Sequence, residues 1–529
     1  MSRFSLLAGL SALSAAGCTA ITDFDAQCVV DAECAAVGRS LVCTRGTCAM
    51  PDLVFPEVSA TVPAGEATLG CYTLFGETDA SADTLTLGTL LPLSGGLADE
   101  GPAMEDGVRL AVAEINQAGG INGRMLRVLA CDSGTQADVA ERAAQHLVDV
   151  ADVPAIIGPG SSTEVIATYG SVARESGTLL ISPSATSPEI SLVDETGLLW
   201  RTVPSDALQG GVIAGYLAHR AYERIYVVHR DDAYGNGLAS VVRNAYCDPR
   251  SCANTFRSQA YPTDDLSLAQ ADVHAAILAD IEAFAPDAVV LVGYAPDGLS
   301  FLRLAEGKPW AFVLAEGLRT GGLVDGLRDR DGALLVPGLD DPQLLCNIVG
   351  TYPSYRRDTA GYQAFADRYR QLTGGKEPGT YSVHAYDATY ALAFAAAAAA
   401  GAGVRTPRGR DLAEGLARLS HGVPVTLGSP LDGSFGTGVR ALRFDALGTI
   451  DLVGLSGPLD FDANGDPASS MELWNLDPDP VLSESGGSRI VTLGTVWDGV
   501  AVDATGAGVY SFAQIPQQNA SPACGAAEP

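Results

Sequence analysis

The sequence predicts an α/β fold made of two doubly wound lobes joined by a hinge that the chain crosses several times. Three observations lead to this prediction. From about residue 84, short apolar strands alternate with amphipathic helices, which is the pattern of a parallel sheet with right-handed crossovers. The alternation starts again near residue 204, and long helical segments return at residues 360–400. We therefore expect a cleft between the carboxyl ends of two sets of strands.

The elements of the first lobe follow one another in a regular order. Its best-defined helix begins at Pro102, because apolar residues recur at helical spacing until Gly119 and Gly120 end it. The predicted strands are 85–91, 125–130, 155–157 and a strand from 179, and the predicted helices are 102–117, 136–148 and 162–176.

The second lobe is predicted from residue 204 onward. Its strands are 224–229, 288–292 and 311–314, and its helices are 235–245 and 298–305. After about residue 420 the sequence becomes rich in Gly and Pro, with short strand candidates. The predicted segments are a leader at 1–17, a Cys-rich module and linker at 18–83, lobe 1 at 84–203, lobe 2 at 204–337, a second part of lobe 1 at 338–440, and a C-terminal return segment and tail at 441–529.

Composition excludes some classes of function. The chain has 529 residues, a formal net charge of −31 and 47% hydrophobic residues, which is ample for two cores. Its two lysines are Lys308 and Lys376, and neither precedes Ser or Thr as a phosphate-binding loop requires. Nucleic-acid binding needs a surplus of cations, so we expect no nucleic-acid partner.

The N-terminus has the pattern of an export signal. Arg3 supplies a positive charge, Phe4–Leu13 supplies a short apolar run, and small residues precede Cys18. This resembles a bacterial lipoprotein signal, in which Cys18 is lipidated and anchors the protein to a membrane outside the cytosol. The alternative is a plain secretion signal with Cys18 in a disulfide.

Cysteine usage also fits an oxidising compartment. Eleven cysteines are present, so ten remain if Cys18 carries lipid. Four of them crowd one short segment and predict a disulfide-stapled module, since their spacing is not that of a zinc site: Cys28, Cys34, Cys43 and Cys48. Cys247 and Cys252 flank a tight loop and are placed to bridge each other. Partners for the remaining four stay open: Cys71, Cys131, Cys346 and Cys524.

One apolar segment needs to be distinguished from a membrane span. Residues 385–404 are mostly alanine, but Asp387 and Tyr390 interrupt them and glycines end them. We interpret this segment as a closely packed helix of the folded domain, with a membrane-spanning helix as the alternative.

The stretch Leu179–Pro188 is the most informative site candidate. An apolar strand runs into a turn in which Pro183 and Pro188 hold the backbone extended. The hydroxyl and N–H groups of Ser184, Ala185 and Thr186 would then point outward from a strand end, as a carboxylate site requires. The alternative is an ordinary Pro-rich loop.

Several segments together resemble the branched-chain amino-acid type of periplasmic substrate-binding protein, the receptor of an ABC importer with a type I periplasmic-binding fold. They follow in family order: Leu91–Gly96, Glu114–Arg124, Ile157–Ser162, Ile181–Pro188, Trp200–Gly210, Ala233–Ala239 and Ala315–Gly317. The resemblance covers roughly residues 84–400 and implies an extracytoplasmic receptor that closes on a small molecule for a membrane permease.

The resemblance also implies an amino-acid pocket. Ser162, at a helix start, would bind the ligand α-carboxylate together with Ser184 and Thr186, while Glu316 in the second lobe would face the α-ammonium. Three tyrosines would form pocket walls: Tyr234, Tyr294 and Tyr381. Each residue has a structural alternative, such as a helix cap for Ser162, a solvated loop carboxylate for Glu316 and half-buried packing for the tyrosines.

Glu100 departs from the family pattern, because leucine-type receptors often carry an aromatic residue near this position. An acidic residue at the pocket mouth predicts a ligand more polar or cationic than leucine, or a different side-chain pocket.

The remaining motifs predict neither catalysis nor a cofactor. Residues 460–465 begin like a calcium loop, but Met471 stands where a bidentate Glu is needed. We therefore interpret them as a turn that resembles one near the C-terminus of this family. The histidines are scattered, and no nucleophile elbow is present. We therefore expect a binding protein. Alternatives are a ligand-sensing lipoprotein of the same fold that signals to a partner and, more remotely, a secreted α/β enzyme.

Overall fold

The structure is a computed structural model. It describes residues 42–44, 47–49, 71–77, 84–247, 252–263, 268–305, 307–326, 346–355, 357–379, 381–428, 434–444, 447–467, 469–477, 489–502 and 508–510. The leader, the lipidation site expected at Cys18 and the stapling expected of Cys28 and Cys34 lie outside these residues.

The chain divides into two compact units, residues 1–54 and 55–529. In the first unit, strands β1 (Val42–Thr44) and β2 (Thr47–Ala49) form an antiparallel hairpin that sets Cys43 opposite Cys48 in the register. The second unit contains both lobes.

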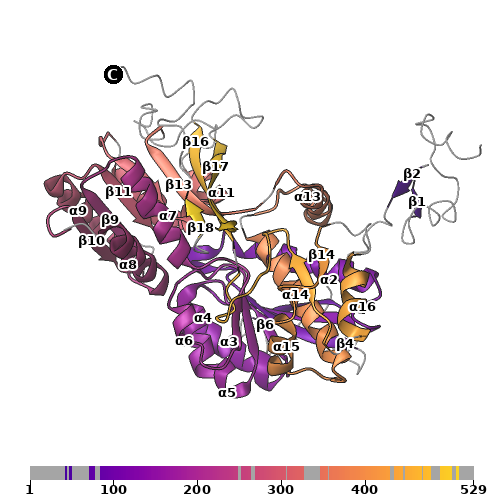
Figure 1. Cartoon of the computed structure of the whole chain (residues 1–529). Helices are drawn as coiled ribbons and strands as arrows, with labels where there is room; N and C mark the ends of the chain where they lie inside the picture. Colours follow the sequence, from indigo (N-terminus) through magenta and orange to yellow (C-terminus); the bar gives the residue numbers. More distant parts are fainter. Residues whose placement is uncertain are drawn as a thin grey trace, which may run out of the picture. The chain divides into compact units, whose positions relative to one another are not determined.

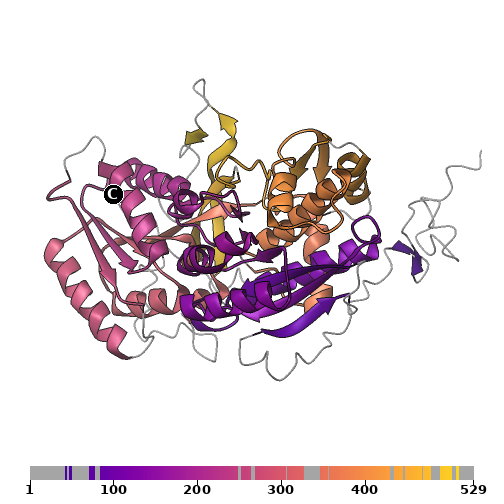
Figure 2. The ribbon, with the colours of Figure 1, turned by 90° about the horizontal axis from the view of Figure 1, so that it is seen from below.

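The first lobe is built on a six-stranded sheet in the order β3-β5-β4-β6-β7-β8 (Figures 1 and 2). All neighbours pair in parallel except β3, which is antiparallel to β5. The strands are β3 (Cys71–Gly76), β4 (Thr84–Leu91), β5 (Met125–Asp132), β6 (Ala155–Ile157), β7 (Leu179–Ser182) and β8 (Leu199–Arg201). The predicted parallel sheet is confirmed, and β3 adds an edge strand that a disulfide between Cys71 and Cys131 ties to β5.

Helices of the first lobe come from two distant parts of the chain. They are α2 (Gly101–Gln117), α3 (Ala137–Asp149), α4 (Ser162–Thr168), α5 (Arg174–Ser176), α6 (Ile190–Val193), α13 (Ala360–Thr373), α14 (Ser382–Gly401), α15 (Gly409–Leu416) and α16 (Ser434–Phe444). A π-helical turn joins α4 to α5, so residues 162–176 form the continuous helical segment that the sequence predicts. A small parallel pair, β14 (Val423–Thr426) and β15 (Ile450–Val453), lies next to α16.

The second lobe has an eight-stranded sheet in the order β10-β9-β11-β12-β13-β16-β17-β18. Strands β10 to β13 run parallel, and the last three are antiparallel to their neighbours. The strands are β9 (Ile225–Arg230), β10 (Phe256–Tyr261), β11 (Ala288–Val292), β12 (Ala311–Leu314), β13 (Ile348–Ser354), β16 (Ser470–Asp477), β17 (Arg489–Val502) and β18 (Gly508–Tyr510).

This sheet departs from the predicted segment boundaries at β13. We expected residues 338–440 to return to lobe 1, but β13 pairs with β12 and extends the second sheet. Its apolar start at Ile348 and Val349 gives no sign of which sheet it joins, because both sheets have buried parallel strands. Helices of this lobe are α7 (Asp206–His219), α8 (Ala233–Cys247), α9 (Leu268–Phe284), α10 (Ala295–Leu304) and α11 (Gly321–Gly326). The predicted Cys247–Cys252 bridge is confirmed, and Cys346 is also disulfide-bonded.

The alanine-rich segment forms α14, whose residues from Ser382 to Ala399 are all buried. Glycines of neighbouring helices allow close contact with it: a Cβ on Gly107 would lie 2.3 Å from the Ser382 carbonyl oxygen, and one on Gly415 would lie 2.5 Å from that of Ala395. Small side chains thus let three helices pack closely. Among the described residues, no helix has the length and hydropathy needed to cross a bilayer.

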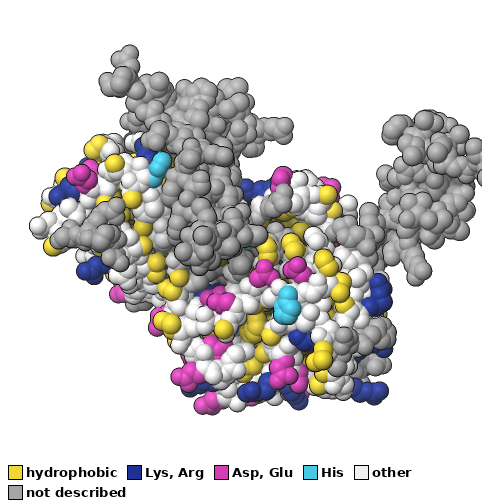
Figure 3. Space-filling view, viewed as in Figure 1, with side chains coloured by type: hydrophobic (Ala, Val, Ile, Leu, Met, Phe, Trp, Pro, Cys, Tyr) yellow, Lys and Arg dark blue, Asp and Glu magenta, His cyan; other side chains and the backbone are white. Residues whose placement is uncertain are grey.

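Charged side chains of both signs are mixed on one face of the molecule. On the face shown in Figure 3, Lys and Arg side chains lie among Asp and Glu side chains and hydrophobic groups. Ion pairs of this kind include Arg142–Asp138 at 2.8 Å on α3, which is exposed and contributes little to stability.

Candidate functional site

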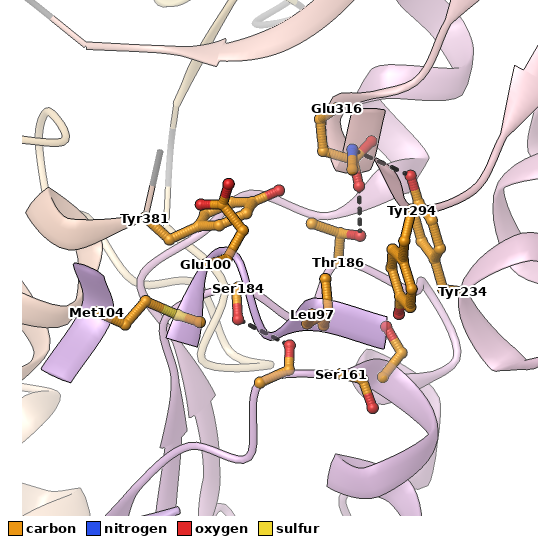
Figure 4. Close-up of a pocket in the computed structure, with 13 residues that line it drawn as sticks. Leu97, Glu100, Met104, Ser161, Ser184, Thr186, Tyr234, Tyr294, Glu316 and Tyr381 are labelled. Carbon is orange, nitrogen blue, oxygen red and sulfur yellow. Dashed lines mark hydrogen bonds between the residues drawn. The ribbon is translucent and has the colours of Figure 1, made fainter. Parts of the chain in front are cut away.

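A pocket lies where the carboxyl ends of strands from both sheets meet (Figure 4). Parallel strands of a doubly wound sheet place the loops that follow them at one edge, which is where ligands bind in such folds. The lining residues follow β4, β6 and β7 in the first lobe and β9, β11 and β12 in the second, and one precedes α14. They are Leu97, Glu100, Met104, Gly160, Ser161, Ser162, Ser184, Thr186, Tyr234, Tyr294, Glu316, Gly317 and Tyr381.

The turn after β7 forms one wall through its side chains. The Ser184 hydroxyl donates to the Gly160 carbonyl oxygen at 2.7 Å, so the two loops after β6 and β7 are tied together. The backbone N–H groups of Ser184 and Ala185 donate to the Ser182 hydroxyl, at 3.4 and 3.0 Å. The sequence predicted that these N–H groups point outward, and the structure instead uses them within the turn because Ser182 provides a nearer acceptor.

Arg201, at the end of β8, fixes the same turn from behind. Its fully buried side chain donates to the carbonyl oxygens of Ala185 and Ser187, at 3.4 and 2.9 Å. It also forms a two-point ion pair with Asp466, at 2.5 and 2.8 Å. Asp466 directly follows residues 460–465, whose sequence begins like that of a calcium loop. Among the described residues, no cluster of metal-binding side chains is found. Thus the C-terminal turn supports the pocket through Arg201.

The loop after β6 begins α4 with a reciprocal cap. The Ser161 hydroxyl donates to Glu164 at 2.8 Å, and Glu164 also accepts the Ser161 N–H at 3.1 Å. Burial raises the pKa of Glu164 to about 7. The Ser162 hydroxyl accepts the N–H of Ser187 at 3.2 Å. Both serines line the pocket, whereas the sequence identified Ser162 and missed Ser161.

Two buried carboxyl groups meet at Thr186. Its hydroxyl lies 2.9 Å from Asp206 and 3.2 Å from Glu316, which comes from the opposite lobe (Figure 4). Asp206 is fully buried, and Glu316 is 2% exposed. Burial raises the pKa of both, and the charge on Glu316 adds to the effect on Asp206. A ligand ammonium placed here would relieve that electrostatic cost.

The second lobe contributes an aromatic wall. Tyr234 and Tyr294 stack almost parallel, with ring centroids 5.7 Å apart, and the Tyr234 hydroxyl accepts the Gly317 N–H at 3.4 Å. The Arg230 guanidinium lies 4.1 Å from the Tyr294 ring centroid and pairs with buried Asp297. These contacts fix the ring planes that a ligand would meet.

The remaining wall is formed by the first turn of α2 and by Tyr381. Glu100 is 4% exposed, and Figure 4 shows its carboxylate beside Tyr381. Met104 and Leu97 supply apolar surface, and Leu97 also packs into the apolar core of the second lobe. The wall thus combines one carboxylate with apolar surface, and the more polar ligand expected from Glu100 stays a prediction.

Direct contacts join the two lobes around the pocket. Besides Thr186–Glu316, the Ala233 N–H donates to the Thr163 hydroxyl at 3.2 Å, and Tyr294 lies against Gly96. The two lobes are therefore in direct contact around the pocket.

Most residues that the sequence proposed for the site are found together. Seven of them line the pocket: Ser162, Ser184, Thr186, Tyr234, Tyr294, Glu316 and Tyr381. Ala185 is buried behind the turn and does not line it. Sequence reasoning missed Asp206 and Arg201, although both lie in the segment Trp200–Gly210, one of those that carry the family resemblance.

Comparisons with known proteins identify the family of this chain. The sequence profile of the periplasmic binding protein family matches residues 84–444. An amino acid binding protein of Pseudomonas aeruginosa is 28% identical over 357 residues, which cover 66% of this chain and 86% of that protein. A Leu/Ile/Val-binding protein of Escherichia coli is 32% identical over 184 residues, which cover 34% of this chain and 49% of that protein. Several of the curated relatives are thus matched over about half of their length.

Solved structures show the same fold. The branched-chain amino acid transporter substrate-binding protein LivJ from Streptococcus pneumoniae, in complex with isoleucine, has a TM-score of 0.56 at 22% identity and covers 77% of this chain and 99% of its own. A solute-binding protein from R. palustris in complex with benzoate has a TM-score of 0.56 at 19% identity and covers 82% of this chain and 99% of its own. The predicted two-lobed fold is confirmed, and the chain belongs to the periplasmic binding protein family.

Proposed function

We propose that this protein is an extracytoplasmic receptor that binds a free amino acid between its two lobes and presents it to the permease of an ABC importer. The observation that carries the proposal is the buried contact between Thr186 of the first lobe and Glu316 of the second. A ligand ammonium at this point touches both lobes, so that binding favours the closed arrangement.

The opposite end of the ligand would meet hydroxyl groups. Ser161, Ser162 and Ser184 come from two adjacent loops of the first lobe and line the same pocket. Hydroxyl groups donate to a carboxylate without placing a full positive charge in the site. The pocket therefore fits an α-carboxylate on one side and an α-ammonium on the other.

The names of the relatives support the choice of ligand class. Several are amino acid or Leu/Ile/Val-binding proteins, while one structural neighbour is a complex with benzoate. Benzoate has a carboxylate and no ammonium, so the carboxyl pair at Thr186 favours an amino acid here. The signalling receptor and the secreted enzyme, considered as alternatives from the sequence, gain no support from these relatives. Lipid anchoring at Cys18 remains part of the proposal.

Isothermal titration calorimetry with a panel of amino acids and carboxylic acids tests the proposal. We expect at least one amino acid to bind, and its affinity to fall tenfold or more in Glu316→Gln, because a charge-assisted hydrogen bond is worth about 1.5–3 kcal/mol. The double replacement Ser184→Ala and Thr186→Ala should weaken binding similarly.

Ser171→Ala is the matched control for hydroxyl loss, since Ser171 is exposed on the helix and bonds Ala167 within it. Unchanged amino-acid affinity in both pocket variants would contradict the proposed site. Tighter binding of benzoate than of every amino acid would contradict the ligand class.

A further inference from the structure

Two hydroxyl groups at the carboxylate end of the pocket have roles that do not depend on pH. Ser184 donates its hydroxyl proton to the Gly160 carbonyl oxygen at 2.7 Å, and a carbonyl oxygen can only accept. The Ser162 hydroxyl accepts the Ser187 N–H at 3.2 Å, so its own proton can point toward a ligand. One proton is thus committed to an acceptor that does not titrate, and the other is available to a carboxylate.

Ser161 differs from both, because its hydroxyl proton is held by a group that can titrate. Ser161 lines the pocket (Figure 4), and its hydroxyl donates to Oε2 of Glu164 at 2.8 Å. The same carboxyl oxygen also accepts the Ser161 N–H at 3.1 Å. In an ordinary capping box the N-cap hydroxyl only accepts a hydrogen bond, so that its proton is available elsewhere. Here an ionised Glu164 occupies both donors of Ser161 and leaves none for a ligand carboxylate.

The surroundings of Glu164 favour its neutral form. Its side chain is fully buried, and burial is the largest cause that raises its pKa to about 7. Hydrogen-bonding groups of Ser161, Ser133 and Gln136 oppose this effect only in part. From the second lobe, the phenol of Tyr294 lies close enough for the charge of Glu164 to raise the Tyr294 pKa. Glu164 therefore changes its protonation state near neutral pH.

The elements packed on α4 are α3, α6, α8 and the π-helical turn that follows α4. With their N-caps they carry four buried titratable residues and several partly or fully exposed charged ones: His146, Tyr169, Tyr234 and Tyr246, then Asp138, Glu141, Arg142, Asp149, Glu189 and Arg243. Behind Tyr294, Arg230 is paired with Asp232 and Asp297. Water and salt screen exposed charges, so burial remains the main influence on the pKa of Glu164.

We infer that Glu164 is a positioning residue that, in its neutral form, turns the Ser161 hydroxyl toward the carboxylate of the bound amino acid. The neutral acid donates its proton to the Ser161 oxygen, which then donates its own proton to the ligand. A proton from solvent is therefore taken up together with the ligand. The inference rests on the proposed function, because the ligand carboxylate must lie at this end of the pocket.

The ionised form of Glu164 opposes binding in two ways. It keeps the Ser161 proton, so the ligand carboxylate loses one charge-assisted hydrogen bond. It also places a negative charge about 5 Å from that carboxylate, because both groups would contact the same hydroxyl oxygen. The contribution of Glu164 to affinity is therefore complete below its pKa of about 7 and is lost as the pH rises through that value, by at most about tenfold per pH unit.

Calorimetry with the standard L-amino acids tests this inference. They are screened at about pH 6, and the tightest binder is titrated with the wild type and with Glu164→Gln at about pH 6 and about pH 8.5. Glutamine suits this capping position and cannot ionise, so it imitates the neutral acid. At the lower pH the two proteins should bind alike. Between the two pH values, the wild-type affinity should fall by about tenfold or more relative to that of Glu164→Gln.

Glu175→Gln is the matched control, because it removes an exposed carboxylate from α5 in the same helical segment, and it should keep the wild-type pH dependence. Ser161→Ala tests the hydroxyl independently and should bind about tenfold more weakly than the wild type at the lower pH. The same pH dependence in the wild type and Glu164→Gln, or wild-type affinity in Ser161→Ala, overturns the inference and leaves the proposed function standing. If no amino acid binds at either pH, the proposed function fails together with the inference.

Discussion

The two faces of the pocket are each supported by one buried arginine, but the arginines support different things. Arg201 in the first lobe donates to backbone carbonyl oxygens of the turn after β7. Arg230 in the second lobe lies over the ring of Tyr294 and pairs with Asp297. The first lobe thus fixes its face through the backbone, and the second through side-chain packing.

Chain connectivity explains the difference. Arg201 is 265 residues from its partner Asp466, so the pair joins β8 to the C-terminal turn. Arg230 is 67 residues from Asp297, which also accepts the Tyr294 N–H in the first turn of α10. A long-range pair holds a turn in place across the lobe, while a local pair orients one ring. Replacing each of the two arginines should therefore lower the free energy of unfolding by a different amount.

The largest effect is expected for Arg201→Met. It leaves Asp466 without its ion pair and the Ala185 carbonyl oxygen without the guanidinium donor, while the Ser187 carbonyl oxygen keeps only the Ile190 N–H. Breaking such a buried pair costs about 3–5 kcal/mol of unfolding free energy. Urea denaturation monitored by fluorescence measures the loss. Arg142→Met, in an exposed pair, should cost less than about 1 kcal/mol. Similar losses in the two variants would show that Arg201 does not support the turn.

A smaller effect is expected for Arg230→Met. Asp297 keeps its contact with the Tyr294 N–H, and the N-terminal end of α10 favours a negative charge. We expect a loss of about 3 kcal/mol, the lower end for a broken buried ion pair, because Asp297 keeps this contact and Asp232, the other partner of Arg230, keeps the Gly235 N–H. The same denaturation measurement compares it with Arg201→Met. A larger loss for Arg230→Met would reverse the comparison.

The sequence predicted some of the residues on the two faces of the pocket and missed others. Local patterns predict strands and the loops after them, but they do not predict contacts between distant residues. Strand–helix alternation predicted strands β4 to β7 of the first sheet but not its edge strands β3 and β8, and the loops after the predicted strands identified Ser184 and Thr186. The resemblance placed Glu316, Tyr234 and Tyr294. In contrast, the roles of Arg201 and Asp466 depend on a contact across 265 residues, which no local pattern encodes. The position of β13 likewise depends on tertiary pairing, because its sequence fits either sheet.

The third prediction concerns the protonation of the two carboxyl groups at Thr186, where the two faces of the pocket meet. The Thr186 hydroxyl has one proton, yet it lies 2.9 and 3.2 Å from two carboxyl groups, those of Asp206 and Glu316. Without a cation between them, the two carboxyl groups are most stable when they share one proton. Burial raises the pKa of both groups, and Arg201 only partly opposes this at Asp206.

A bound ammonium would favour the ionised carboxyl groups and lower their pKa, so the complex holds fewer protons than the free protein. Affinity should then rise with pH above the ordinary carboxyl values of 3.8 and 4.5, by at most about tenfold per pH unit for one proton released. Calorimetry in two buffers of different ionisation enthalpy measures the release. Identical binding enthalpies in both buffers would contradict proton sharing at Thr186.

The smallest effect is expected for Tyr234→Phe, which tests how far the second face depends on packing alone. The change keeps the ring stacked on Tyr294 but removes the hydroxyl that accepts the Gly317 N–H. A neutral hydrogen bond is worth about 0.5–1.5 kcal/mol, so amino-acid affinity should fall by about two- to tenfold. Tyr226→Phe is the control, because its hydroxyl bonds Asp280 and Tyr226 does not line the pocket.

A greater loss for Tyr234→Phe than for Ser184→Ala and Thr186→Ala together would mean that the second lobe also fixes its face by hydrogen bonds. An unchanged affinity would instead mean that the stacked rings alone form this wall. We expect an affinity loss between these two outcomes, because the Tyr234 hydroxyl holds the backbone at Gly317, the residue that follows Glu316. Loss of that contact should therefore act on the ligand ammonium through the position of the Glu316 carboxyl group.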